Sequence, residues 1–116
     1  MVKRFELAAA QGDCFLIKVD TLPELIQLAK SENGQFIVAH SETGHHHVIE
    51  ANLDRVKMFD DPNDPLTAWI QVIADDVHLE HQRTFDTHEA LNPAPGFYKV
   101  RRQREYTPEG FRRAAD

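Results

Sequence analysis

The longest strand candidate in this chain is Phe97-Tyr98-Lys99-Val100-Arg101-Arg102-Gln103-Arg104-Glu105-Tyr106. Aromatic and β-branched residues, which favour extended backbone, recur along it. A turn sequence, Asn92-Pro93-Ala94-Pro95-Gly96, comes directly before it. After it, Thr107-Pro108 is typical of a helix N-cap followed by the first helical residue. We therefore expect a long strand over residues 97–106 and a brief terminal helix.

Similar short runs of strand-forming residues, separated by turn signals, fill most of the remaining chain. Gly12-Asp13, Asn33-Gly34 and the Asp/Pro-rich residues 60–65 are such turn signals. Many short strands with frequent turns are typical of a small β-barrel or β-sandwich. The further strands that we expect lie at residues 14–19, 35–40, 45–51, 55–59, 68–73 and 77–81.

One upstream segment has helical rather than strand spacing. Pro23 suits the first position of a helix. The residues that then fall on one helical stripe are Leu22, Leu25, Ile26 and Ala29. The predicted fold is therefore mostly β, a single domain over residues 1–116, built as a small barrel or sandwich with one or two short accessory helices.

Composition narrows the class of protein. The 116 residues suit one domain with one core. The net charge of −6 disfavours non-specific binding to nucleic acid.

No apolar run is long enough to span a bilayer and the N-terminus lacks a signal core, so we expect a cytoplasmic protein without membrane contact. The single Cys14 excludes an intramolecular disulfide and a cysteine-rich zinc motif.

Six of the seven histidines lie in two short segments. These are His40-Ser41-Glu42-Thr43-Gly44-His45-His46-His47 and, about thirty residues later, His78-Leu79-Glu80-His81. Neutral imidazole is the commonest protein ligand for zinc, copper, iron and nickel. Two histidine-rich segments joined by a loop can close on one ion, so the sequence predicts a site for a divalent transition metal such as zinc.

Strand alternation selects the ligands. His45 and His47 are two residues apart and would project from the same side of a strand. On a straight strand His78 and His81 would face opposite ways, so only one of them would meet that pair. A turn or bulge near Glu80 would let both converge. The predicted metal ligands are therefore His45, His47 and one or both of His78 and His81, with His40 in reserve.

Beside such an ion, Glu80 can have one of three roles. It can be a carboxylate ligand, a partner that orients an imidazole, or a general base. In the last case the protein would be a metal-dependent, hydrolytic enzyme in which Glu80 acts on metal-activated water. A second hypothesis has no metal: the histidines form a hydrogen-bonded core in a non-enzymatic accessory or structural protein that binds a protein partner or forms a homo-oligomer.

Four motifs together resemble a known family of small, uncharacterised bacterial and bacteriophage proteins. The resemblance covers most of the chain and implies no particular reaction, because no activity is established for that family. It supports the choice of the two histidine segments. The motifs stand here as Gln11-Gly12-Asp13, Gly44-His45-His46-His47-Val48, His78-Leu79-Glu80-His81 and Tyr98-Lys99-Val100-Arg101-Arg102-Gln103-Arg104-Glu105-Tyr106.

The last of these motifs also carries a possible binding face. The residues that alternate on one side of the strand are Tyr98, Val100, Arg102, Arg104 and Tyr106. Arginines bind phosphates and tyrosines stack on bases, which leaves nucleic-acid binding open despite the net charge. The competing interpretation is that the arginines pair with acids, Glu50 or Glu80 among them, while the tyrosines pack at the rim of the barrel.

Overall fold

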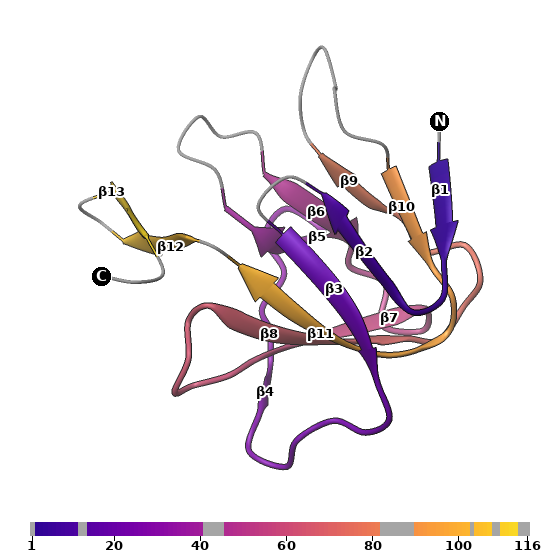
Figure 1. Ribbon diagram of the computed structural model, residues 1–116, viewed down its shortest axis with the longest axis horizontal. Helices are drawn as coiled ribbons and strands as arrows, with labels where there is room; N and C mark the ends of the chain where they lie inside the picture. The colour runs from indigo at the N-terminus through magenta and orange to yellow at the C-terminus, as the bar shows by residue number, and fades with distance from the viewer. Residues whose placement is uncertain are drawn as a thin grey trace.

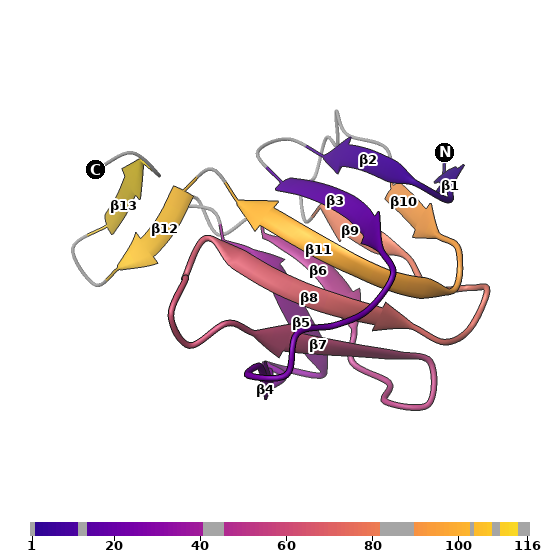
Figure 2. The ribbon, with the colours of Figure 1, turned by 60° about the horizontal axis from the view of Figure 1, so that its bottom comes forward.

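A computed structural model of the chain describes residues 2–11, 14–40, 46–81 and 90–102, together with the backbone of two later strands. These are β12 (Arg104–Thr107) and β13 (Gly110–Arg113), which pair with each other in an antiparallel hairpin. The other strands form two sheets that face each other (Figures 1 and 2).

The first sheet has five strands. Their order across the sheet is β1 (Val2–Phe5), β10 (Ala90–Pro93), β9 (Leu79–His81), β6 (His47–Glu50) and β5 (Gln35–Ala39). Only the pairing of β1 with β10 is parallel. The two histidine-containing strands, β6 and β9, are therefore direct neighbours within one sheet.

The second sheet has six strands, all antiparallel to their neighbours. Strand β11 lies near the middle, hydrogen-bonded to β3 on one side and β8 on the other. The order across this sheet is β2 (Ala8–Gln11), β3 (Cys14–Val19), β11 (Gly96–Arg102), β8 (Thr67–Val72), β7 (Val56–Asp60) and β4 (Gln27–Leu28).

The core lies between the inner faces of the two sheets. Tyr98 and Val100 of β11 are fully buried, and so is Leu79 of β9 in the facing sheet. The Tyr98 hydroxyl donates a 2.6 Å hydrogen bond to the Ala94 carbonyl, and its ring meets Phe5 edge-on at 5.5 Å. Each large side chain buried in this way contributes about 1.5–3 kcal/mol. Packing between two alternating sheet faces is what holds the fold together.

The structure confirms the mostly β fold and corrects its details. Apart from the β12–β13 hairpin, the described strands form two sheets and do not close into a barrel, so the fold is sandwich-like. Strands occur where the sequence predicts them at residues 14–19, 35–40, 55–59, 68–73 and 77–81, with ends shifted by up to two residues. The predicted strand over residues 97–106 is divided between β11 and β12.

Both predicted helices are wrong. The segment after Pro23 contains β4, whose backbone pairs with β7, and Leu25 is 81% exposed rather than packed on a stripe. A helix this short has little stability of its own, so hydrogen bonds to a free sheet edge prevail. The second predicted helix falls at the hairpin of β12 and β13, although Pro108 itself lies outside the described residues. Within the described ranges no helix has the length and apolar character needed to cross a bilayer.

Candidate histidine site

Several strand ends meet at one end of the sandwich (Figure 1). In the second sheet Gln11 pairs with Cys14, which pairs with Arg102 at the end of β11. In the first sheet Ala39 pairs with His47, which pairs with His81 at the end of β9. The register of the two sheets thus brings polar side chains from distant parts of the sequence to the same end.

His47 and His81 form a stacked pair at this end. They are directly opposite each other in the β6–β9 ladder, their ring centroids are 4.3 Å apart, and their planes differ by 2°. His47 is only 6% exposed, and the Nδ1 atom of His81 is also buried. Both side chains lie on the inner face of the first sheet, because Ile49 and Leu79 beside them are core residues.

Gln11 connects this pair to the second sheet. Its side chain is buried, its Nε2 donates to the Leu79 carbonyl at 3.2 Å, and its Oε1 lies 2.7 Å from Nδ1 of His47. A carbonyl oxygen only accepts, so the Leu79 bond fixes which end of the amide faces His47. The Nδ1 atom of His47 must then carry the hydrogen, and the lone pair of the neutral ring lies on Nε2.

A second histidine pair lies near the first. The rings of His40 and His46 meet edge-on, with centroids 5.1 Å apart and planes at 75°. Desolvation lowers the pKa of His40, and the positive charges of His46 and Arg102 lower it further. The carboxylates of Glu32 and Asp60 act in the opposite direction. The net effect favours the neutral imidazole form of His40.

Arg102 closes the same end of the sandwich. Its Nε donates to the Val38 carbonyl at 2.6 Å and its Nη1 to the Pro65 carbonyl at 3.0 Å, so one side chain links β5 to the β7–β8 connection. Burial lowers the pKa of its guanidinium. The predicted pairing of Arg102 with Glu50 or Glu80 does not occur. Tyr98 lies in the core. The described part of the β11 face on which the sequence placed tyrosines and arginines is therefore interior and does not form a binding surface.

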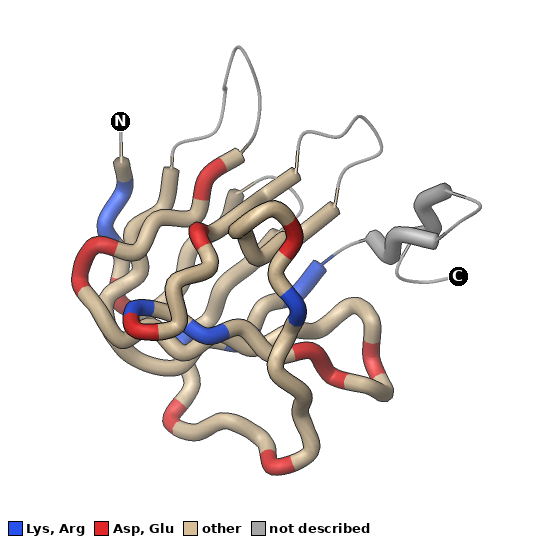
Figure 3. Tube along the Cα trace, turned by 180° about the vertical axis from the view of Figure 1, so that it is seen from behind, with Lys and Arg blue, Asp and Glu red and all other residues tan. Residues whose placement is uncertain are grey.

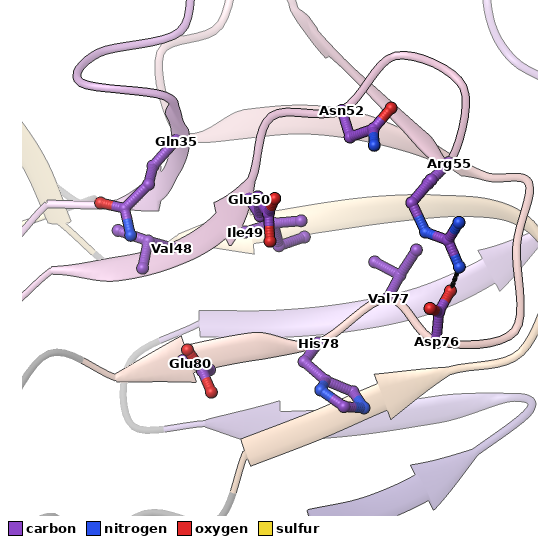
Figure 4. Close-up of a pocket in the computed structure, with 10 residues that line it drawn as sticks. All are labelled: Gln35, Val48, Ile49, Glu50, Asn52, Arg55, Asp76, Val77, His78 and Glu80. Carbon is purple, nitrogen blue, oxygen red and sulfur yellow. Dashed lines mark ion pairs between the residues drawn. The ribbon is translucent and has the colours of Figure 1, made fainter.

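His78 and Glu80 lie on the opposite face of the first sheet. They project with Glu50 and Gln35 into a cavity of about 480 Å³, the acidic groove (Figure 4). Arg55 forms an ion pair with Asp76 at one end of it. The residues that line the acidic groove are Gln35, Val48, Ile49, Glu50, Asn52, Arg55, Asp76, Val77, His78 and Glu80.

A family model described as Domain of unknown function (DUF8820) matches residues 10–103. The chain belongs to this family. The match spans both histidine segments and Gln11, and it confirms the expectation of an uncharacterised family. A bacterial or bacteriophage origin stays a prediction. No curated protein matches the chain, and no solved structure does.

Of the predicted ligands in this DUF8820 chain, the structure brings His47 and His81 together. His78 and Glu80 lie on the other face of the sheet, because the backbone stays extended over Leu79–His81. His45 falls outside the described residues. Among the residues that are described, no group of three or more His, Cys, Asp or Glu side chains is placed to hold a metal ion.

Sequence reasoning missed the role of Gln11. The Gln-Gly-Asp motif marked the turn before β3, but nothing in it indicates that the glutamine side chain crosses to the other sheet. The usable signal was a polar residue at the inward-facing position of a strand, directly before a turn. Such a residue must find a hydrogen-bond partner, and a buried imidazole is a suitable one.

Proposed function

We propose that this chain is a metal-binding protein that takes a divalent transition ion such as zinc. In this proposal His47 and His81 supply two imidazole ligands, and His45, two residues before His47, supplies a third. The observation that supports it best is the 2.7 Å contact between His47 Nδ1 and Gln11 Oε1. Histidines that bind metals commonly donate their other ring N–H to a fixed acceptor in this way.

The tautomer that Gln11 selects is the one a ligand needs. With the hydrogen on Nδ1, His47 presents the Nε2 lone pair to an ion. The acceptor is a neutral amide, so it orients the ring without adding a negative charge that would favour the imidazolium form. In the neutral ring, Nε2 is therefore the atom that carries the lone pair for an ion.

The stacked rings must rearrange to share an ion. An ion lies in the plane of each imidazole that binds it, whereas these planes are parallel and the centroids 4.3 Å apart. Two nitrogen ligands of tetrahedral zinc are about 3.3 Å apart. A turn of the His81 ring about its χ2 torsion meets this requirement, because such terminal torsions are soft. His81 is the last residue of β9.

The proposal does not include His78 or Glu80 as ligands or base, because they project into the acidic groove on the other side of the sheet. It also assigns no reaction. A metal-dependent hydrolytic activity would need a base on the inner side of the sheet, near His47 and His81.

The same contacts favour a second candidate function. The hydrogen bonds of Gln11 and the stack of His47 on His81 form a complete structural unit that joins the two sheets without an ion. In that case the histidines stabilise a small interaction protein, and recognition of a partner takes place elsewhere on its surface.

Elemental analysis of the untagged protein tests the proposal. The wild type is expected to contain about one equivalent of a transition metal after dialysis, and His47→Ala and His81→Ala are expected to contain none. His78→Ala is the matched control because it removes an imidazole from the same segment on the opposite face. It is expected to keep the metal.

The outcomes separate the two candidates. A metal-free wild type with a native circular-dichroism spectrum, which also fails to bind added zinc in a calorimetric titration, would overturn the metal proposal and favour the structural unit. Loss of metal in His78→Ala but not in His47→Ala would also contradict it, since the ion would then lie in the acidic groove.

A further inference from the structure

Positive charge is concentrated on the second sheet, although the protein as a whole has a net charge of −6. Its six strands contain one acidic residue, Asp60, which follows the inward-facing positions Val56 and Met58. The acids of the chain lie mainly in the connecting segments and on the first sheet (Figure 3). The basic residues on the strands of the second sheet are Lys18, Lys57, Lys99, Arg101 and Arg102.

Aromatic rings share the outer face of this sheet with those charges. On β11 the outward positions are Phe97, Lys99 and Arg101, since Tyr98 and Val100 point into the core. Trp69 of β8 is directly opposite Lys99, whose ammonium lies 5.7 Å from the centre of the indole ring. Phe15 of β3 is directly opposite Arg101.

The rings are partly exposed, and two of them are directly opposite each other. Phe15, Phe97 and Trp69 each keep some contact with solvent, as does Phe59 opposite Trp69 on β7. The other aromatic side chains that the structure describes, Phe5, Phe36 and Tyr98, are buried in the core. Every partly exposed Phe, Tyr or Trp side chain that the structure describes therefore lies on one face, interleaved with Lys57, Lys99 and Arg101. Of these cations, Arg101 also forms a 3.2 Å ion pair with Asp64 of the β7–β8 connection.

We propose that this outer face of the second sheet binds single-stranded nucleic acid, independently of the histidine site. The face is defined here as the basic–aromatic face: Phe15, Lys57, Phe59, Trp69, Phe97, Lys99 and Arg101. Unpaired bases stack on aromatic rings, and lysine and arginine meet the phosphates between them. An antiparallel sheet with such residues on adjacent strands presents several stacking positions on one face.

The exposed aromatic rings favour a single strand over a duplex. The net charge of −6 opposes both, but in a duplex the bases are already stacked and only phosphates are offered. Single strands add base stacking to a few local phosphate contacts. The main rival is the acidic groove of a second copy, with Glu50 and Glu80, which would make the sandwiches stack head to tail.

The only tryptophan of the chain lies on the proposed face, so it reports binding directly. Titration of the full chain with a thymidine oligonucleotide of about 20 nucleotides is expected to quench Trp69 fluorescence and raise the anisotropy of a label on the oligonucleotide. Two or three phosphate contacts predict an affinity loss of about 7-fold to 20-fold between about 50 mM and 200 mM salt.

Two variants and a matched control test the face. Phe97→Ala is expected to weaken binding by about 5-fold to 150-fold, the range for loss of one stacked base. Lys99→Gln is expected to weaken it by about 5-fold near 0.1 M salt and to make the salt dependence shallower. Lys3→Gln removes the same charge from exposed β1 of the other sheet and is expected to change neither quantity. Thermal melts establish that each variant is folded.

Absence of quenching and of anisotropy change at micromolar protein and low salt would overturn the proposal. Equal effects of Lys99→Gln and Lys3→Gln would also overturn it, because binding would then follow overall charge. Sedimentation of the protein alone tests the rival. A mass that rises with concentration, and that falls in both Lys99→Gln and Glu80→Gln, would assign the face to contact between copies of the chain instead.

Discussion

His78 and His81 are three residues apart in one segment, yet their surroundings have little in common. His81 stacks on the buried ring of His47 between the sheets, whereas His78 is exposed beside the acidic groove. The difference arises because successive residues of a strand project to opposite faces. Residues three positions apart therefore face opposite ways. Two histidines of one sequence motif therefore belong to two different sites.

Polar side chains on the two faces of the first sheet also differ in whether they need a hydrogen-bond partner. On the inner side of the sheet, each buried polar group needs a hydrogen-bond partner. Gln11 forms hydrogen bonds with both the Leu79 carbonyl and the His47 ring. On the outer side, Glu50, His78 and Glu80 remain in contact with water and need no fixed partner. Substitutions on the inner side should therefore change stability far more than substitutions in the groove.

The largest expected effect is that of His47→Ala. It removes a buried ring and leaves the Gln11 oxygen without its donor, so the free energy of unfolding should fall by about 3 kcal/mol. His78→Ala should change it by less than about 0.5 kcal/mol, as is usual for exposed positions. Urea denaturation in the presence of a chelator measures both without a contribution from bound metal. Equal losses in the two variants would contradict the division into inner and outer sites.

Gln11→Ala should have a smaller effect, about 1–3 kcal/mol, because it removes the hydrogen bonds that Gln11 forms with the His47 ring and the Leu79 carbonyl. Gln27→Ala, at an exposed glutamine of β4, is the control and should cost less than about 0.5 kcal/mol. Both values come from the same urea titrations. A loss for Gln11→Ala no larger than that for Gln27→Ala would show that the bond between the sheets adds no stability.

Gln11 also offers a sharper test of the tautomer argument. Gln11→Ala should weaken zinc binding by about 10-fold to 100-fold, the usual effect of losing the group that orients a histidine ligand. Gln27→Ala, at an exposed glutamine on the opposite edge of the second sheet, is the control and should leave the affinity unchanged. Competition with a chromophoric chelator measures both. Equal affinities of Gln11→Ala and Gln27→Ala for zinc would contradict the role of Gln11 in orienting the His47 ring.

The local part of this fold could be predicted from the sequence, and the long-range part could not. Alternation and turn residues located β3, β5, β7 and β8 to within two residues. They missed β2 and β10, whose residues Ala8–Gln11 and Ala90–Pro93 have little strand preference. Such strands exist because a neighbouring strand supplies hydrogen bonds, and pairing between distant segments leaves no local pattern.

The candidate site shows the same limit. The pairing of His47 with His81 was among the predicted alternatives, because alternation allowed one of His78 and His81 to meet the first segment. Which of them does so depends on the register of β6 against β9, which the structure sets as His47 opposite His81. The approach of Gln11 depends on how the two sheets stack, a property of the whole core rather than of any motif.

The smallest expected effect concerns pH and His40. Its pKa in the folded protein is lowered, first by desolvation and then by His46 and Arg102, so the unfolded chain binds a proton more readily below about pH 6.5. Stability should therefore be unaffected by this group at higher pH and should fall as the pH decreases through 6.5 towards the lower folded value. Melting temperatures between about pH 7.5 and 5.5 should consequently decline less in His40→Gln than in the wild type.

His78→Gln is the control for this last measurement, because it replaces an exposed histidine on the other face of the first sheet. It should leave the slope of melting temperature against pH as it is in the wild type. An equal change of slope in both variants would mean that the net charge of the protein governs its acid sensitivity. A change in His40→Gln alone would place that sensitivity at the end of the sandwich, where His40 is desolvated beside His46 and Arg102.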